Sequence, residues 1–251
     1  MIRLKNKAQI DGIRTSCKLL ATMFAELEGL VVPGAETLEL DRWVQDWIRR
    51  AGGIPAFLGY GDDHNPFPAA LCISINEEVI HGIPGKRILK EGDLVSLDCG
   101  INYKGYFSDM ALTMEIGTVS EEARLLNQCT RECLYKAIEA VKAGNRIHDV
   151  SRAVMNHAQA AGYGVVSSFC GHGVGLAPHE DPQVPNIPHG PNPRIQNGLV
   201  FAIEPMINLG TGEVELLEDD WTVVTADGSL SAHWEHSVVM VDGICEVLTL
   251  L

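Results

Sequence analysis

Long apolar runs are missing from this sequence of 251 residues. No stretch approaches the roughly 18 consecutive apolar residues that a membrane-spanning helix needs. The opening segment, Met1–Lys7, mixes apolar with polar and basic residues and lacks the apolar core of a secretion signal. We therefore expect a cytoplasmic protein without membrane contact.

Positive charge is also scarce. The chain has 19 Lys and Arg residues against 33 Asp and Glu residues, a formal net charge of −14, and no block rich in Lys or Arg. This balance argues against the basic surface that is typical of nucleic-acid-binding proteins. The seven cysteines are odd in number and include no Cys-x-x-Cys pair, which predicts free thiols in a reducing compartment.

What the sequence does contain is a regular alternation of helical and strand-like patterns. Apolar residues at spacings of three and four predict helices over residues 6–29, 37–51, 120–143 and 148–161. Thr37 and Ser120 are the expected N-caps of the second and third helices. Apolar, β-branched segments predict strands over 71–75, 93–99 and 105–116, and further strands between 165 and 251.

Acidic residues stand at the ends of several apolar strands. The strand that begins at Leu94 runs into Asp98, and the run Leu199–Ile203 is followed directly by Glu204. Another acid, Glu235, comes shortly before an apolar run and has a histidine close on each side. A buried carboxylate is costly unless it is paired or binds a cation. These positions therefore indicate a metal site.

The two halves of the chain share a pattern. Residues 92–98 and 198–204 both consist of a glycine, an apolar strand and an acid, and each segment follows two expected helices and a His-Gly pair. This echo suggests a duplicated α+β unit with the site between its halves. We expect one domain over 1–251, with halves of about 1–118 and 119–251.

One set of side chains would suit a pair of divalent cations. Carboxylates can bridge two ions, and imidazole completes the ligand sphere of Mn²⁺, Fe²⁺, Co²⁺ or Zn²⁺. Taken singly, each member also has an ordinary structural explanation as a turn, loop or surface residue. The other histidines at positions 64, 148, 157 and 189 are expected to be ordinary surface or core residues. The proposed ligand set is Asp98, Asp109, His172, Glu204 and Glu235.

Other catalytic motifs do not fit. His179-Glu180 begins like a zincin helix, but residue 183 is Gln and Pro182 would break the helix. The glycines around His172 do not have the dinucleotide-binding spacing, and no Gly-x-Ser-x-Gly elbow is present. These glycines are better explained as positions where the backbone passes close to a site.

At these motifs the chain resembles the type I methionine aminopeptidases, in their short bacterial form. The resemblance spans nearly the whole sequence, and it implies an α+β pita-bread fold: a pseudo-twofold duplicated unit around a curved antiparallel sheet. The matching segments include Cys72–Glu77, His81–Pro84, Gly171–Gly175, His179–Val184, Ile203–Met206, Asp220–Thr222 and Glu235-His236.

The resemblance also implies roles for individual residues. Asp98 would bind one metal ion, His172 and Glu204 the other, and Asp109 and Glu235 both. Glu204 would in addition transfer a proton during peptide cleavage. His81 and His179 would contact the substrate and stabilise the transition state. An apolar pocket for the methionine side chain would be formed by Tyr60, Phe67, Cys72 and Trp221.

The implied reaction is removal of the initiator methionine from nascent proteins that have a small second residue. The expected partners are the N-terminus of the nascent chain and, transiently, the ribosome, and the expected state is a monomer. Two alternatives stay open: a proline-directed aminopeptidase of the same fold, and a non-catalytic binding protein. Departures from the family pattern at Phe57, at Pro178 and in a longer loop over 61–70 concern the pocket.

Overall fold

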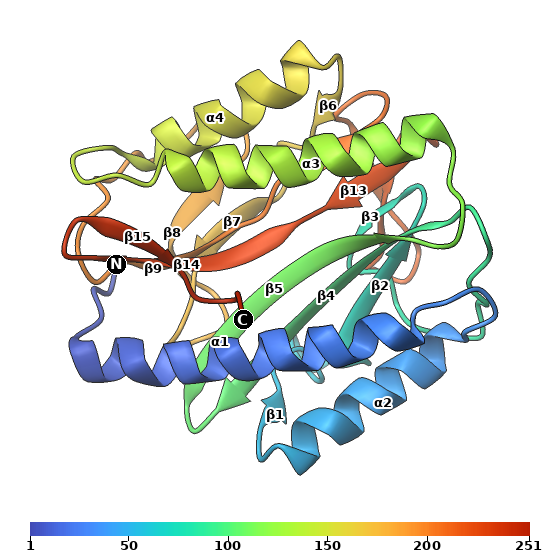
Figure 1. Cartoon of the computed structure of the whole chain (residues 1–251), viewed down its shortest axis with the longest axis horizontal. Coiled ribbons are helices and arrows are strands. Elements are labelled where there is room, and N and C mark those ends of the chain that lie inside the picture. The colour runs from blue at the N-terminus through green and yellow to red at the C-terminus, as the bar shows by residue number, and fades with distance from the viewer.

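The computed structural model describes residues 1–251 and consists of a curved antiparallel sheet with helices packed against it (Figure 1). The helices are α1 (Lys7–Leu27), the short 3-10 helix η1 (Glu28–Leu30), α2 (Thr37–Arg50), α3 (Glu121–Glu139) and α4 (Ile147–Ala160). None of these helices is both long enough and apolar enough to cross a lipid bilayer.

The strands form one large and two small sheets. In chain order the strands are β1 (Ile54–Pro55), β2 (Leu71–Ile75), β3 (Glu78–Ile80), β4 (Leu94–Tyr103), β5 (Tyr106–Glu115), β6 (Gly164–Val165), β7 (Cys170–Gly173), β8 (Glu180–Pro185), β9 (Val200–Ile203), β10 (Met206–Asn208), β11 (Val214–Leu216), β12 (Val223–Thr225), β13 (Ser231–His233), β14 (Glu235–Val241) and β15 (Ile244–Val247). The main path through the large sheet is β1-β4-β5-β14-β9-β7-β8.

The halves of the chain meet at the centre of this sheet. The β4–β5 hairpin of the first half pairs through β5 with β14 of the second half, and β14 pairs with β9. Helices α1 and α2 contact strands of the first half, whereas α3 and α4 contact mainly strands of the second half. The duplicated arrangement that the repeated sequence pattern suggested is therefore present in three dimensions.

Strand alternation separates the core from the opposite face of the sheet. Leu97 and Cys99 of β4 and Met110 and Leu112 of β5 belong to a buried apolar cluster with residues of α1 and α2. Because successive side chains on a strand point to opposite faces, the residues between them point away from the helices. Asp98 is one of these residues.

Most expected elements are confirmed, with two corrections. Thr37 is not the N-cap of α2, because that position belongs to Glu36, and the Thr37 hydroxyl donates instead to the Gly85 carbonyl at 2.9 Å. The strand expected over 93–99 extends to Tyr103, where it turns directly into β5. Ser120 does cap α3, since its hydroxyl accepts from the Ala123 amide at 3.2 Å.

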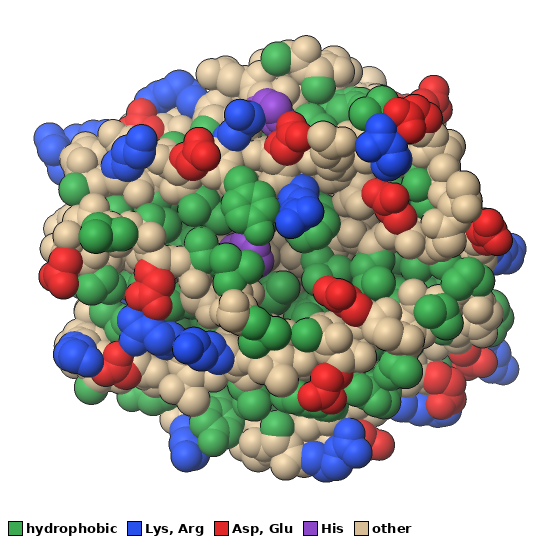
Figure 2. All heavy atoms as spheres, viewed as in Figure 1, with side chains coloured by type: hydrophobic (Ala, Val, Ile, Leu, Met, Phe, Trp, Pro, Cys, Tyr) green, Lys and Arg blue, Asp and Glu red, His purple; other side chains and the backbone are tan.

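The helix-covered face of the molecule has a mixed surface. In Figure 2, Lys and Arg side chains alternate with Asp and Glu side chains over this face, and apolar side chains lie among them. Charges of one sign do not gather there into the continuous patch that nucleic-acid binding requires.

Candidate metal centre

Three carboxylates reach the same face of the sheet through strand register. Asp98 of β4 lies opposite Ala111 of β5, and Ala111 lies opposite Glu235 of β14. Directly paired residues project to one face of a sheet, as do residues two apart on one strand. Asp109 is two residues before Ala111, so it joins Asp98 and Glu235 on this face.

Two further ligand candidates come from β7 and from the end of β9, which lie farther along the same sheet. His172 lies in β7, and Glu204 follows β9, which pairs with β7 between Phe201 and Gly173. A Cβ atom on Gly173 would come within 2.3 Å of the Asp181 carbonyl oxygen. On Gly171 it would come within 2.4 Å of a backbone oxygen of β9. Only glycine allows the backbone to approach this closely on both sides of His172.

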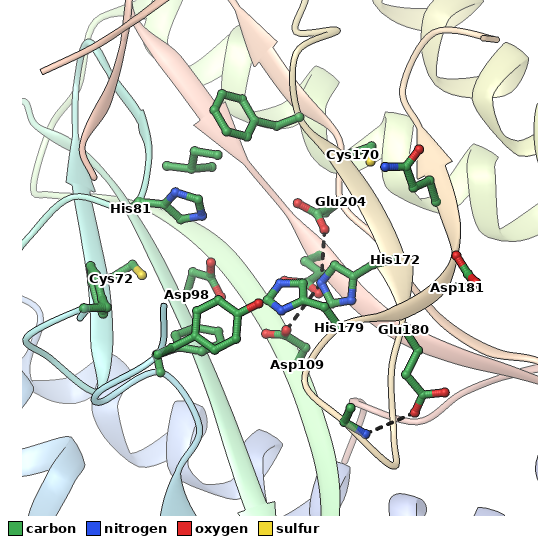
Figure 3. A pocket seen from close by; sticks show the side chains of 18 of the residues that line it. Cys72, His81, Asp98, Asp109, Cys170, His172, His179, Glu180, Asp181 and Glu204 are labelled. Carbon is green, nitrogen blue, oxygen red and sulfur yellow. Dashed lines mark hydrogen bonds and ion pairs between the residues drawn. The ribbon is translucent and has the colours of Figure 1, made fainter. Parts of the chain in front are cut away.

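The side chains of Asp98, Asp109, His172 and Glu204 converge (Figure 3). His172 Nε2 lies 3.6 Å from Asp109 Oδ2 and 3.6 Å from Glu204 Oε1. The ligand atoms of Asp109, His172 and Glu235 all lie within 4.8 Å of one another. Residues from distant parts of the chain therefore place their donor atoms close together. A small shift of these atoms toward one another would let them bind a metal ion.

The carboxylates have few partners within the protein. Asp98 Oδ1, Asp109 Oδ1 and Glu235 Oε1 are buried and make no hydrogen bond. Burial raises the pKa of Asp98 to about 7, and burial together with the neighbouring acids raises the pKa of Asp109, Glu204 and Glu235 well above the ordinary value. Unpaired buried acids of this kind are costly, and divalent cations would satisfy them. The residues therefore fit a metal centre.

The histidine of the cluster has the protonation state that a ligand needs. Burial and the nearby His179 lower the pKa of His172 to about 3, so its imidazole is neutral at neutral pH. Its Nδ1 lies 3.0 Å from the Gly173 carbonyl oxygen. This contact orients the ring and leaves Nε2 directed at the acids, an arrangement common among metal-binding histidines.

The cluster forms part of a cavity of about 690 Å³, a volume typical of small-ligand sites. All of the site residues expected from the sequence line this cavity, the substrate-binding ones included. They are Tyr60, Phe67, Cys72, His81, Asp98, Asp109, His172, His179, Glu204, Trp221 and Glu235.

Two histidines flank the donor cluster without belonging to it. The His179 ring packs against His172 at an interplanar angle of 50° with a centroid distance of 4.1 Å, and the Tyr60 ring lies 5.0 Å from it on centroids. His81 packs edge-on against Trp221 at 6.1 Å. Burial lowers the pKa of His81 to about 4 and also lowers the pKa of His179. Both rings are therefore neutral hydrogen-bonding groups near the cluster.

An apolar compartment adjoins the donors. Phe57, Phe67 and Cys72 are each more than nine-tenths buried and form one cluster against which Trp221 packs. Phe67 and Trp221 meet edge-on with a centroid distance of 5.2 Å. Trp221 Nε1 donates to the Asn65 carbonyl at 3.1 Å, so the loop over 61–70 holds this wall in position.

Comparison with known proteins agrees with this site. A family model for metallopeptidase family M24 matches residues 11–242. The chain belongs to metallopeptidase family M24. A methionine aminopeptidase of Treponema pallidum is 54% identical over 99% of this chain and 96% of its own length. One from Clostridium acetobutylicum is 46% identical over 100% of this chain and 99% of its own.

Solved structures of methionine aminopeptidases are similar to this M24 metallopeptidase over its full length. The crystal structure of a methionine aminopeptidase from Thermotoga maritima superposes with a TM-score of 0.95, at 38% identity, over the full length of both chains. The prolidase of Pyrococcus furiosus shares the fold alone, with a TM-score of 0.75 and 21% identity over 65% of its chain. The expected α+β pita-bread fold is confirmed.

Two residues at the site of this M24 metallopeptidase were not predicted from the sequence. His233 is buried, and its Nε2 lies 3.9 Å from Glu204 Oε2 without a hydrogen bond. Glu180 lines the cavity and accepts hydrogen bonds from the backbone amides of Leu176 and Ala177. The position of His233 two residues before Glu235 was a usable signal, and Glu180 lies in the segment His179–Val184 that the family resemblance marked, although no role was assigned to it.

Proposed function

We propose that this M24 metallopeptidase removes N-terminal methionine from peptides and nascent proteins whose second residue is small. The observation that carries the proposal is the continuity of one cavity, which is lined both by the carboxylate and imidazole cluster and by the apolar cluster of Phe57, Phe67 and Cys72. The names of its full-length relatives support the same activity.

The donor cluster would hold two divalent metal ions. Asp98, His172 and Glu204 would each bind one ion, and Asp109 and Glu235 would bridge both. When bound, such ions polarise a carbonyl and lower the pKa of water. This set of four carboxylates and one imidazole suits Mn²⁺, Fe²⁺, Co²⁺ or Zn²⁺.

The side chains around the cluster supply positioning and proton transfer. Burial and the charge of Asp98 raise the pKa of Glu204 well above the ordinary value. Such a carboxyl group can accept a proton from the attacking water and return it to the leaving amine. His179, as a neutral imidazole, can donate a hydrogen bond to the oxyanion that develops on the scissile carbonyl. His81 would hold the substrate amide on the opposite side.

The apolar compartment would receive the methionine side chain. Phe67, Cys72, Tyr60 and Trp221 line the cavity beside the donors, and a flexible thioether packs well against aromatic rings. A substrate whose first side chain packs against these residues would present its first peptide bond to the donors. This geometry favours cleavage after one residue over cleavage within a chain.

The proposed substrate, a nascent protein with its initiator methionine, indicates where in the cell the enzyme would act. A monomer in the cytoplasm, meeting nascent chains as they leave the ribosome, would encounter initiator methionine before folding buries it. We propose that the entire chain acts as one catalytic domain, with the centre between its two halves.

A peptide panel tests the activity and its rivals together. Protein stripped with a chelator and reloaded with Mn²⁺, Fe²⁺, Co²⁺ or Zn²⁺ is given Met-Ala-Ser, Met-Leu-Ser and Ala-Pro-Ser. We expect metal-dependent release of methionine from the first peptide and much less from the second. Preferential cleavage of Ala-Pro-Ser would instead support the proline-directed enzyme. Metal binding without any cleavage would support a binding protein.

A further inference from the structure

A second group of metal-ligating side chains lies away from the active-site cavity, between α3 and α4. Cys129 and Cys133 are one helical turn apart on α3, and His157 lies on α4, which packs along α3 (Figure 1). One ligand atom from each of the three lies within 4.8 Å of the other two. The sequence predicted an ordinary surface or core residue at His157, and the structure places it beside the two thiols.

The histidine of this group is already oriented. His157 Nε2 lies 2.8 Å from Glu132 Oε2, and the structure contains no protein hydrogen bond to Nδ1. A carboxylate bonded to one ring nitrogen is the usual support for a histidine whose other nitrogen binds a metal. Glu132 and His157 are 46% and 24% exposed. The imidazole side of the group is therefore partly exposed to solvent.

The two thiols form the buried side of the group. Cys133 is fully buried and Cys129 is 7% exposed. The Cys133 thiol donates to the Val154 carbonyl oxygen at 3.7 Å, so this sulfur atom is held in place. Ligands of a tetrahedral zinc ion lie roughly 3.5–3.8 Å apart. A contraction of about 1 Å would therefore convert the observed spacing into a ligand shell.

The chemistry of this group differs from that of the active site. The active-site cluster offers carboxylate oxygens and one imidazole, which suit harder divalent ions, whereas two thiolates and an imidazole select a softer ion. Neither the two thiols nor Glu132 and His157 line the active-site cavity. The groups should therefore fill independently.

We propose that Cys129, Cys133 and His157 form a second, thiolate-containing site that binds Zn²⁺. A water molecule would complete the fourth position, with Glu132 holding the His157 ring from outside the ligand shell. Because the ligands come from two helices, a bound ion would fasten α3 to α4 and stabilise the second half of the fold. The role would be structural, since none of the three ligands lines the active-site cavity.

Metal content of the complete protein tests the proposal. Wild-type protein and the C129S/C133S variant are stripped, incubated with excess Zn²⁺, separated from free metal and analysed. We expect one zinc equivalent fewer in the variant. The C245S variant is the matched control, because Cys245 lies on β15 and belongs to neither cluster. Equal zinc content in wild type and C129S/C133S would overturn the proposal.

Cobalt identifies the ligands directly. Co²⁺ bound by thiolate shows an intense near-ultraviolet charge-transfer band that oxygen and nitrogen ligands do not produce. We expect this band in wild type and in the C170S variant, whose cysteine lines the active-site cavity, and its loss in C129S/C133S. A band that disappears in C170S and persists in C129S/C133S would contradict the assignment.

Two milder variants keep the test valid if the double cysteine variant folds poorly. Glu132→Gln should retain the site but weaken zinc binding about 10-fold, and His157→Gln should weaken it at least ~100-fold, since outer-shell changes alone cost 10–100-fold. Zn²⁺ should raise the unfolding temperature of Mn²⁺-loaded wild type more than that of His157→Gln. Equal zinc affinity in all three proteins would count against the site, whatever their methionine-releasing activity.

Discussion

Lys5 and Glu180 form a buried ion pair between the N-terminal segment and the first residue of β8, beside the active-site cavity. Lys5 Nζ lies 2.7 Å from Glu180 Oε2, and the two side chains are 0% and 5% exposed. The other carboxylate oxygen, Oε1, accepts hydrogen bonds from the amides of Leu176 and Ala177 at 2.7 and 3.1 Å. The pair thus anchors the turn that leads to His179.

Lys5→Met should destabilise the protein and impair the site. The substitution keeps the apolar stem but leaves the Glu180 carboxylate buried without its cation, a change that typically costs about 3–5 kcal/mol. Denaturant unfolding measures the stability, and peptide cleavage below the unfolding transition measures turnover. Lys7→Met is the control, because Lys7 is 90% exposed and its partner Asp11 is a surface residue. Equal behaviour of the two variants would contradict this role for Lys5.

Glu204→Gln should lower turnover at least ~100-fold while the protein stays folded, because the amide cannot exchange the proton. Steady-state cleavage of Met-Ala-Ser at saturating metal separates this effect from weaker metal binding. Glu215→Gln, on the exposed strand β11, is the matched control. Turnover close to that of wild type at saturating metal would remove Glu204 from proton transfer.

Asp109→Asn should weaken binding of active-site metal and leave the metal-free protein at least as stable as wild type. The reason is that the buried Oδ1 of Asp109 has no partner in the protein, so its charge is useful only to a cation. Titration calorimetry with Mn²⁺ measures the first effect and thermal unfolding after chelation the second. Asp63→Asn, in an exposed loop, should change neither quantity. Unaltered Mn²⁺ affinity in Asp109→Asn would argue against Asp109 as a ligand.

Asp98 should make the stability of the metal-free protein depend on pH. Burial raises the pKa of its carboxyl from 3.8 to about 7. The raised pKa means that the folded state holds this proton more tightly than the unfolded state. The resulting contribution to the free energy of unfolding is fully present below pH 3.8 and is lost as the pH rises through about 7. Relative to wild type, chelated Asp98→Asn should become progressively more stable across this range.

Thermal unfolding of the two chelated proteins at about pH 4 and about pH 8 measures this difference. The comparison between variants is needed because buried histidines titrate in the opposite sense: burial lowers the pKa of His172 and His233 to about 3. Their contribution cancels when Asp98→Asn is compared with wild type. A stability gap that stays constant with pH would contradict the raised pKa of Asp98.

Much of the centre was predictable because it depends on local patterns. Asp98 and Asp109 are recognisable where acids interrupt apolar strands, and period-two alternation already places each on a definite face of its strand. The glycines on both sides of His172 indicate a close backbone approach through their residue type alone. The resemblance to known aminopeptidases added residue roles that these patterns left open.

The residues that were missed depend on contacts between distant segments. The pairing of Lys5 with Glu180 joins positions 175 apart, and no local pattern predicts that these two residues meet. The spacing of Cys129 and Cys133 is visible in the sequence, but the approach of His157 depends on how α4 packs against α3. Such contacts follow from burial and shape rather than from a repeating pattern.

The sequence by itself determined which side chains face which side of each strand and helix, because backbone geometry imposes those periods locally. Only the tertiary structure decided which of these faces meet. Curvature of the sheet and pairing of β14 with β5 bring acids from both halves into one cavity. Closure of this kind comes from long-range packing, which no short segment encodes.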